Sequence, residues 1–285
     1  MRWLAAALVV AVAAAVVAVL VRTGAFDAEL NDDETAAVGG GAAEAAPATD
    51  PAMLDLDRPF EPTPAAGWAD GVEGIVPPTA KPVGDFTASE VADALDQVRD
   101  VLVASRLDRT LVVDHDPTRF LSLLAPDARR QLEPLFDGRE PDVQSLVSLA
   151  AGGSALLPAE PKVRGEMTVS RGGTGELVVH TNYVFVYAFQ PTQPLRLVDA
   201  MDTIVVVRAD VDYVLRAGER WTEGSRGLWY DNATGYAYSI GCAQYRRGYL
   251  APATSERAVT PDTTREPASY FDPASPVRFT DGCSA

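Results

Sequence analysis

Hydrophobic residues recur at helical spacing in the middle of the chain and at every second position further on. After Thr87, one helical face is apolar, at Val91, Ala94, Leu95, Val98, Val101 and Leu102. Thr87 and Glu90 have the spacing of a capping box, so this pattern predicts a helix that begins just after Thr87. Asp116 as N-cap and Pro117 as first helical residue predict a second helix, which Pro126 breaks in two. Another short helix is expected in "PDVQSLVSLAAGG".

From Lys162 onward the apolar period changes to two, which is typical of strands with one buried face. Four strands are predicted, over residues 162–170, 175–190, 202–216 and 227–242. The turn "RGGTG" between the first two is favourable for a hairpin. Helices followed by long antiparallel strands predict an α+β domain over residues 86–245, with helices on one face of the sheet and a polar opposite face.

This order of elements resembles the NTF2-like cone fold, in which helices pack on a curved four-stranded antiparallel sheet. The family includes small-molecule isomerases and cyclases as well as non-catalytic domains, some of them anchored in membranes as parts of secretion or envelope assemblies. Its enzymes place an Asp, His or Tyr in the cavity of the cone. By alternation, Asp210 and Asp212 instead share the polar face with Arg208 and His180. We therefore expect neither catalysis nor a cofactor.

Five tyrosines are expected on the inner face of the sheet, which gives an alternative hypothesis. The five are Tyr183, Tyr187, Tyr213, Tyr236 and Tyr238. Buried tyrosine hydroxyls need hydrogen-bond partners, and five exceed what a minimal core uses. In this alternative the domain binds a small hydrophobic ligand, or is an isomerase or cyclase, with the tyrosines lining the cavity.

The segment "QYRRGYL" stands out against an acidic background. Tyr245, Arg246, Arg247 and Tyr249 have the composition of a protein-interaction hot spot. The alternative is that both tyrosines pack under the C-terminal tail. The other dense polar cluster, Asp114-His115-Asp116, is interpreted as the start of a helix rather than an acid–base or metal site. With two cysteines and two distant histidines, no metal site is expected.

The N-terminus predicts a membrane segment. Residues 3–21 carry no charge and are long enough to cross a bilayer as a helix. Arg2 precedes this run, so the expected orientation places the rest of the chain outside the cytoplasm. Residues 1–22 are thus predicted to be the anchor of a single-pass cell-membrane protein. A cleaved signal peptide, and hence a secreted protein, is the alternative.

Residues 23–85 are predicted to be a disordered acidic linker rich in Ala, Pro and Gly. They hold thirteen acidic against two basic residues, a net charge of −11. The alternative for the linker's stretch "AGWADGVEGIVPP", which contains Trp68 and Ile75, is that it docks locally on the domain. The whole chain has a net charge of −16, which argues against nucleic-acid binding. Only two lysines occur, as expected for GC-rich coding sequence.

Cys242 and Cys283 lie on the exported side and are predicted to form a disulfide. The bond would pin the tail, residues 246–285, to the domain. Taken together, the sequence predicts a non-catalytic domain, outside the membrane, that binds a protein partner or takes part in envelope assembly.

Overall fold

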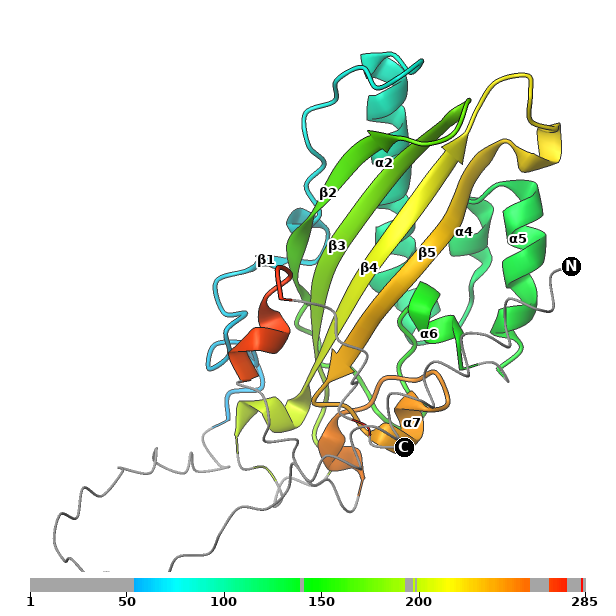
Figure 1. The fold of residues 1–285 in the computed structure, drawn as a ribbon. Helices are drawn as coiled ribbons and strands as arrows, with labels where there is room; N and C mark the ends of the chain where they lie inside the picture. The colour runs from blue at the N-terminus through cyan, green and yellow to red at the C-terminus, as the bar shows by residue number, and fades with distance from the viewer. Residues whose placement is uncertain are drawn as a thin grey trace, which may run out of the picture. The chain divides into compact units, whose positions relative to one another are not determined.

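The computed structural model describes residues 54–138, 141–192, 197, 199–256, 267–275 and 283, and within them it shows an α+β fold (Figure 1). The sheet is antiparallel and its five strands follow the order of the chain. They are β1 Ala69–Asp70, β2 Lys162–Arg171, β3 Glu176–Ala188, β4 Ile204–Arg216 and β5 Gly227–Tyr238. The predicted strands β2 to β5 are confirmed, and β1 is a fifth strand that the prediction lacked.

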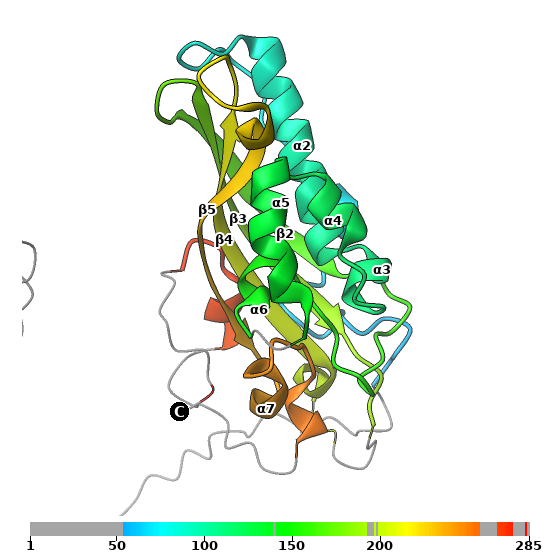
Figure 2. The ribbon, with the colours of Figure 1, turned by 90° about the vertical axis from the view of Figure 1, so that its right-hand side faces the viewer.

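Helices cover one face of this sheet, called the inner face below, as Figure 2 shows. They are α2 Ala88–Arg106, α3 Arg109–Val112, α4 Thr118–Ser122, α5 Pro126–Leu132 and α6 Val143–Leu146. A further helix, α7 (Cys242–Tyr245), follows the last strand. The shorter turns are the 3₁₀ helices η2 Gly71–Gly74, η3 Glu133–Phe136, η5 Ala200–Thr203, η6 Glu223–Ser225, η7 Ala253–Ser255 and η8 Pro267–Phe271.

The predicted helix starts are explained by their caps. At α2, the Thr87 side chain accepts a hydrogen bond from the Glu90 amide and the Glu90 carboxylate accepts one from the Thr87 amide, which confirms the capping box. Helix α4 begins at Thr118, one residue later than predicted, although the Asp116 carboxylate accepts from the Thr118 amide at 2.9 Å as a capping side chain does. The break at Pro126 is confirmed, since α5 starts there with a proline that needs no amide partner.

The main core lies between the helices and the inner face. Strand β3 contributes alternate side chains, including Tyr183, Phe185 and Tyr187, which are all but inaccessible to solvent. Strand β4 contributes Val205, Val207, Ala209, Val211 and Tyr213, and α2 contributes its predicted apolar face. Burial of each large apolar side chain stabilises the fold by roughly 1.5–3 kcal/mol.

Strand β5 contains one extra residue, and this reverses the faces of everything after it. Tyr213 pairs with Tyr230 and the preceding Asp212 pairs with Asn232, so Asp231 is left without an opposite residue. Such a bulge shifts the alternation of side chains by one position. Before the bulge the even-numbered residues of β5 face inward, and after it the odd-numbered ones do.

The prediction that Tyr236 and Tyr238 face inward is therefore wrong. Tyr236 pairs with Arg208 and Tyr238 pairs with Val206, both on the outer face of β4. Ala237, between them, joins the main core.

The outer face carries a second hydrophobic cluster, which corrects two further predictions. Val184, Val186 and Val206 pack there beneath two segments from the ends of the described chain, one near Phe60 and one containing Tyr270 and Phe271. The rest of the cluster consists of Ala65, Leu157, Ala188, Ile204 and Tyr236. The outer face is thus not polar throughout. Phe60, Ala65 and Ile75 are buried against the domain, so part of the predicted linker docks on it.

Among the described residues, no helix has the length and apolar character needed to cross a membrane. The predicted anchor, residues 1–22, and the first part of the predicted linker, residues 23–53, lie outside the described residues.

Candidate functional site

Two of the predicted pocket tyrosines have hydroxyl groups with partners inside the core. The Tyr187 hydroxyl donates to the Arg106 carbonyl or to the Ser148 hydroxyl, each at 2.9 Å. The hydroxyl oxygens of Tyr213 and Tyr230 lie 3.2 Å apart. Burial raises the pKa of Tyr187 and of Tyr213 to about 12, because the phenolate form would lose its hydration. These contacts are those of a structural core.

Tyr183 differs, because its buried hydroxyl has no hydrogen-bond partner among the described residues. Burial, together with the negative charge of Glu166, raises its pKa to about 12. Gly165 lies opposite Tyr183 on β2, and its missing side chain leaves room for the tyrosine ring.

The cavity beside Tyr187 is small. It has a volume of about 20 Å³, and Arg106, Leu156 and Ala188 are among the residues that line it. Ligand pockets usually measure about 300–1,000 Å³, whereas a single water needs about 10–15 Å³. The predicted pocket tyrosines are divided between the two faces of the sheet, and this cavity has room for one water.

Arg106 is a buried charge that the sequence analysis did not single out. Its guanidinium donates to the Gln144 carbonyl at 3.2 Å, the Ser145 carbonyl at 2.7 Å and the Ser148 hydroxyl at 3.3 Å. No carboxylate forms an ion pair with it within the part of the chain that the structure describes. The two carbonyls belong to the short helix α6, so Arg106 joins the end of α2 to α6.

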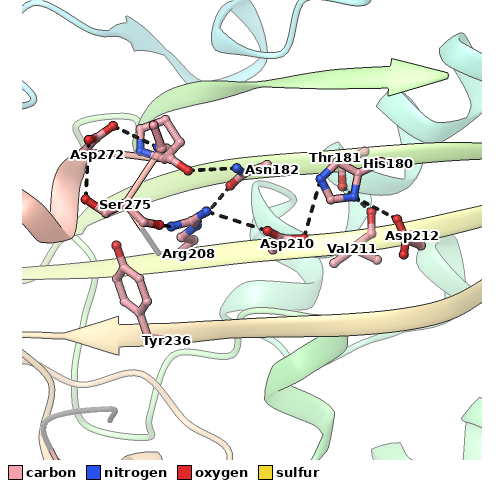
Figure 3. A network of polar contacts seen from close by, with 12 residues as sticks. His180, Thr181, Asn182, Arg208, Asp210, Val211, Asp212, Tyr236, Asp272 and Ser275 are labelled. Atoms are coloured by element: carbon pink, nitrogen blue, oxygen red, sulfur yellow. Dashed lines mark hydrogen bonds and ion pairs between the residues drawn. The ribbon is translucent and has the colours of Figure 1, made fainter. Parts of the chain in front are cut away.

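A network of polar contacts lies on the outer face around Arg208 (Figure 3). The Arg208 side chain is only 4% exposed. Its Nε donates to Asn182 Oδ1 at 3.0 Å, and one terminal nitrogen donates to the Ser275 carbonyl. The other terminal nitrogen lies 3.7 Å from Asp210, and the guanidinium lies 6.0 Å from the Tyr236 ring centroid. The predicted solvated position of Arg208 is wrong, because a segment far along the chain covers it.

His180 lies further along the same face, between two carboxylates. Its Nδ1 is 2.8 Å from Asp212 and its Nε2 is 3.7 Å from Asp210. The imidazole side chain is 41% exposed, in agreement with its predicted surface position. A general base acts best in a water-poor pocket, whereas the side chains of this His–Asp cluster are 21–41% exposed to solvent. We interpret it as a cross-strand charge ladder.

The predicted interaction patch is divided by burial. Arg246 and Arg247 are exposed, whereas Tyr245 and Tyr249 are half-buried and pack against the main core. The Tyr249 ring lies on the His115 imidazole, with centroids 5.3 Å apart. The tyrosines therefore hold the turn in place and leave two adjacent arginines on its surface.

His115 belongs to the start of a helix rather than to an acid–base site. Its backbone is left-handed, with φ of 61°, and its Nε2 lies 2.9 Å from the Ala150 carbonyl. Hydrogen bonds from Thr118 lower the pKa of Asp116. In the described part of the chain, no three His, Cys, Asp or Glu side chains group in a way that could hold a metal ion.

Cys242 and Cys283 form the predicted disulfide, with Cα atoms 5.3 Å apart. The bond joins the first residue of α7 to a cysteine 41 positions further along the chain.

Comparisons with protein-family models, with curated proteins and with solved structures found no match. Two features described above bear on function: the exposed arginine pair that follows α7 and the polar network around Arg208 on the outer face.

Proposed function

We propose that this chain is a single-pass membrane protein of the cell envelope whose NTF2-like domain, outside the cytoplasm, binds another protein and catalyses no reaction. The proposed contact is the arginine turn, defined as residues 242–250. Arg246 and Arg247 would meet acidic groups of the partner. The uncharged run of residues 3–21 supports the membrane anchor, and the Cys242–Cys283 disulfide is compatible with an oxidising compartment.

The observation that carries this proposal is the rigid support beneath two exposed arginines. The Leu250 amide donates to the Leu149 carbonyl at 2.7 Å, and the Ala151 amide donates to the Leu250 carbonyl at 2.8 Å. The Glu256 carboxylate accepts from the Ala243 amide at 2.7 Å and thereby caps the start of α7. The disulfide and the Tyr249–His115 contact add to these restraints. Side chains on a preorganised backbone lose less conformational entropy on binding, which favours affinity.

Site-specific photo-crosslinking in cells that make the protein tests this function. Benzoylphenylalanine replaces Ala243, which is exposed on α7, and in a control chain it replaces the exposed Ser122 on α4. We expect one discrete protein adduct from position 243 and none from position 122. The double reversal Arg246→Glu with Arg247→Glu should abolish the adduct and leave the melting temperature unchanged within a few degrees.

A matched reversal of two other exposed arginines, Arg130 and Arg171, changes the net charge equally and should preserve the adduct. An adduct that survives the reversal at Arg246 and Arg247 would refute the arginine turn as the binding site.

The second candidate function is binding of a small hydrophobic ligand at the inner face. The Tyr183 hydroxyl, which has no hydrogen-bond partner within the described part of the chain, is the observation in its favour. The cavity of about 20 Å³ beside Tyr187 is too small for such a ligand. Native mass spectrometry of the full chain, released from detergent, separates the two candidates. A small molecule that co-purifies with the unmodified chain but not with Tyr183→Phe would favour the ligand-binding function. A mass equal to that of the chain alone favours the protein-binding function.

A further inference from the structure

A nine-residue segment, residues 267–275, lies across the outer face and is called the strap below. Figure 2 shows its helix η8 on the side of the sheet opposite to α2, α4 and α5. Two of its side chains, Tyr270 and Phe271, are 2% and 3% exposed, whereas Ala268, Asp272 and Ala274 point to solvent. The strap thus contacts the sheet through a pair of adjacent aromatic residues.

These two aromatic side chains fit an aromatic surface on the domain. The Tyr270 ring stacks on Tyr238 with centroids 3.8 Å apart and meets Tyr236 edge-on at 5.7 Å. The Phe271 ring meets Trp68 edge-on at 6.0 Å. Aromatic pairs in such arrangements contribute beyond their buried area, and aromatic residues dominate the hot spots of interfaces.

Three polar contacts join side chains of the outer face to main-chain carbonyls of the strap. The Tyr236 hydroxyl donates to the Tyr270 carbonyl at 2.8 Å, and Asn182 Nδ2 donates to the Pro273 carbonyl at 2.8 Å. Arg208 donates to the Ser275 carbonyl. Every polypeptide carries such carbonyls, so these three donors recognise a backbone path and not particular side chains. The combination of side-chain pockets with main-chain hydrogen bonds is how many domains bind peptides.

Local hydrogen bonds within the strap also stabilise its turn. The Asp272 carboxylate accepts from the Ala274 amide at 2.9 Å, and the Ser275 amide donates to the Asp272 carbonyl at 3.1 Å. Asp and Pro residues favour such turns. Contacts within the strap therefore favour the turn. This turn places the carbonyls of residues 273 and 275 opposite Asn182 and Arg208.

From these contacts we propose that the outer face is a peptide-binding site, which the strap occupies as a ligand attached to the same chain. Its partner is a segment of another protein with two adjacent aromatic residues followed by a tight turn. The site consists of Trp68, Asn182, Arg208, Tyr236 and Tyr238. This site is separate from the arginine turn. The proposal that it binds a peptide does not depend on whether the arginine turn binds a partner.

Attachment of the strap at both sides explains why the site is closed in the isolated chain. Beyond the strap, Cys283 is bonded to Cys242, and before it Glu256 is hydrogen-bonded to the start of α7. A ligand tethered at short range has an effective concentration on the order of millimolar, so a separate peptide competes poorly with it. A partner occupies the site only when it binds more tightly than the strap or when the strap is displaced.

Fluorescence anisotropy tests the proposal on the full chain in detergent, with a labelled peptide of residues 267–275, "PASYFDPAS". The test chain carries Tyr270→Ala and Phe271→Ala, which remove the two anchors of its own strap. We expect this chain to bind the labelled peptide at least about tenfold more tightly than the unmodified chain, because the competing ligand is weakened. A peptide in which both aromatic residues are alanine should not bind, and neither peptide should bind empty micelles.

Thermal unfolding verifies that the test chain is folded. If the test chain is not folded, the variant Cys242→Ser with Cys283→Ser replaces it. This variant keeps the aromatic anchors but releases the chain after residue 275 from α7. It should bind more of the labelled peptide than the disulfide-bonded chain does. As a check on the site itself, adding Asn182→Ala to the test chain should weaken peptide binding several-fold.

A folded test chain that does not bind the peptide, or that binds the alanine peptide equally well, would show that the strap is only a structural cover. Dimers formed by mixing test and unmodified chains without peptide would overturn the assignment to a separate partner, because the strap of a second copy would then be the occupant.

Discussion

Tyr213 on β4 lies opposite Tyr230 on β5, with ring centroids 4.7 Å apart, directly beside the extra residue Asp231. This pair belongs to the main core, and the tyrosines that follow the bulge belong to the outer face. One inserted residue therefore separates the aromatic core from the aromatic surface that holds the strap.

The buried tyrosines make the stability of the fold sensitive to alkaline pH. The pKa of Tyr187 is raised from the ordinary 10 to about 12, so the folded chain holds this proton more tightly than the unfolded chain does. Its contribution is complete below pH 10 and is lost as the pH rises from 10 towards 12. Tyr187→Phe should cost about 1 kcal/mol at pH 8 and reduce the decline above pH 10. Urea unfolding at pH 8 and pH 11 measures both effects, and parallel declines would contradict the prediction.

The disulfide should stabilise the fold by restricting the unfolded chain. Cys242→Ser with Cys283→Ser opens a loop spanning 41 positions, which corresponds to about 4 kcal/mol in the chain-entropy model. Amide hydrogen exchange should locate the first loss of protection in the strap. A reducing agent should reproduce this effect in the unmodified chain and leave the double variant unchanged. Equal protection of the strap in both chains would show that its contacts alone hold it.

Removal of the buried Arg208 charge should loosen the strap and destabilise the domain. Arg208→Met leaves the Asn182 side chain and the Ser275 carbonyl without a donor, at a cost of about 1–3 kcal/mol for each buried group left unpaired. Arg171→Met, at an exposed position near the end of β2, is the control and should change the free energy of unfolding by less than about 0.5 kcal/mol. Similar values for the two variants in chemical denaturation would mean that the Arg208 network contributes nothing.

Gly165 should tolerate no side chain. A Cβ atom at this position would collide with the Asn182 carbonyl and lie 2.6 Å from the Tyr183 Cα. Gly165→Ala should therefore destabilise the fold by about 1–3 kcal/mol, as overpacking does elsewhere. The control is Gly152→Ala, where a Cβ would meet nothing within 4 Å. Thermal unfolding compares the two, and a melting temperature for Gly165→Ala equal to that of the control would be inconsistent with the tight β2–β3 contact.

The elements that could be predicted from the sequence are those specified by local signals. The capping box of Thr87 and Glu90 defines the start of α2, and the alternation in β3 and β4 assigns their inner faces correctly. The same alternation fails in β5, because Asp231 shifts the register and nothing in "WYDNATGY" distinguishes a bulge from a turn.

The parts that could not be predicted depend on contacts between distant segments. Arg208 looks like one member of an exposed charge ladder, but the strap covers it, with Ser275 bonded to it from 67 positions further along the chain. Residues 54–68 have the composition of a linker, yet Phe60 and Ala65 pack on the outer face. Short-range patterns do not contain this information.

The bulge has a second consequence, for the exposed edge of the sheet. Strand β5 is the last in the sheet order, and an edge strand with unpaired amides and carbonyls can template the addition of strands from other molecules. Asp231 and Asn232, both exposed, put a backbone irregularity and a negative charge in the middle of that edge. At high protein concentration, this irregularity should keep neighbouring copies from joining their sheets into aggregates.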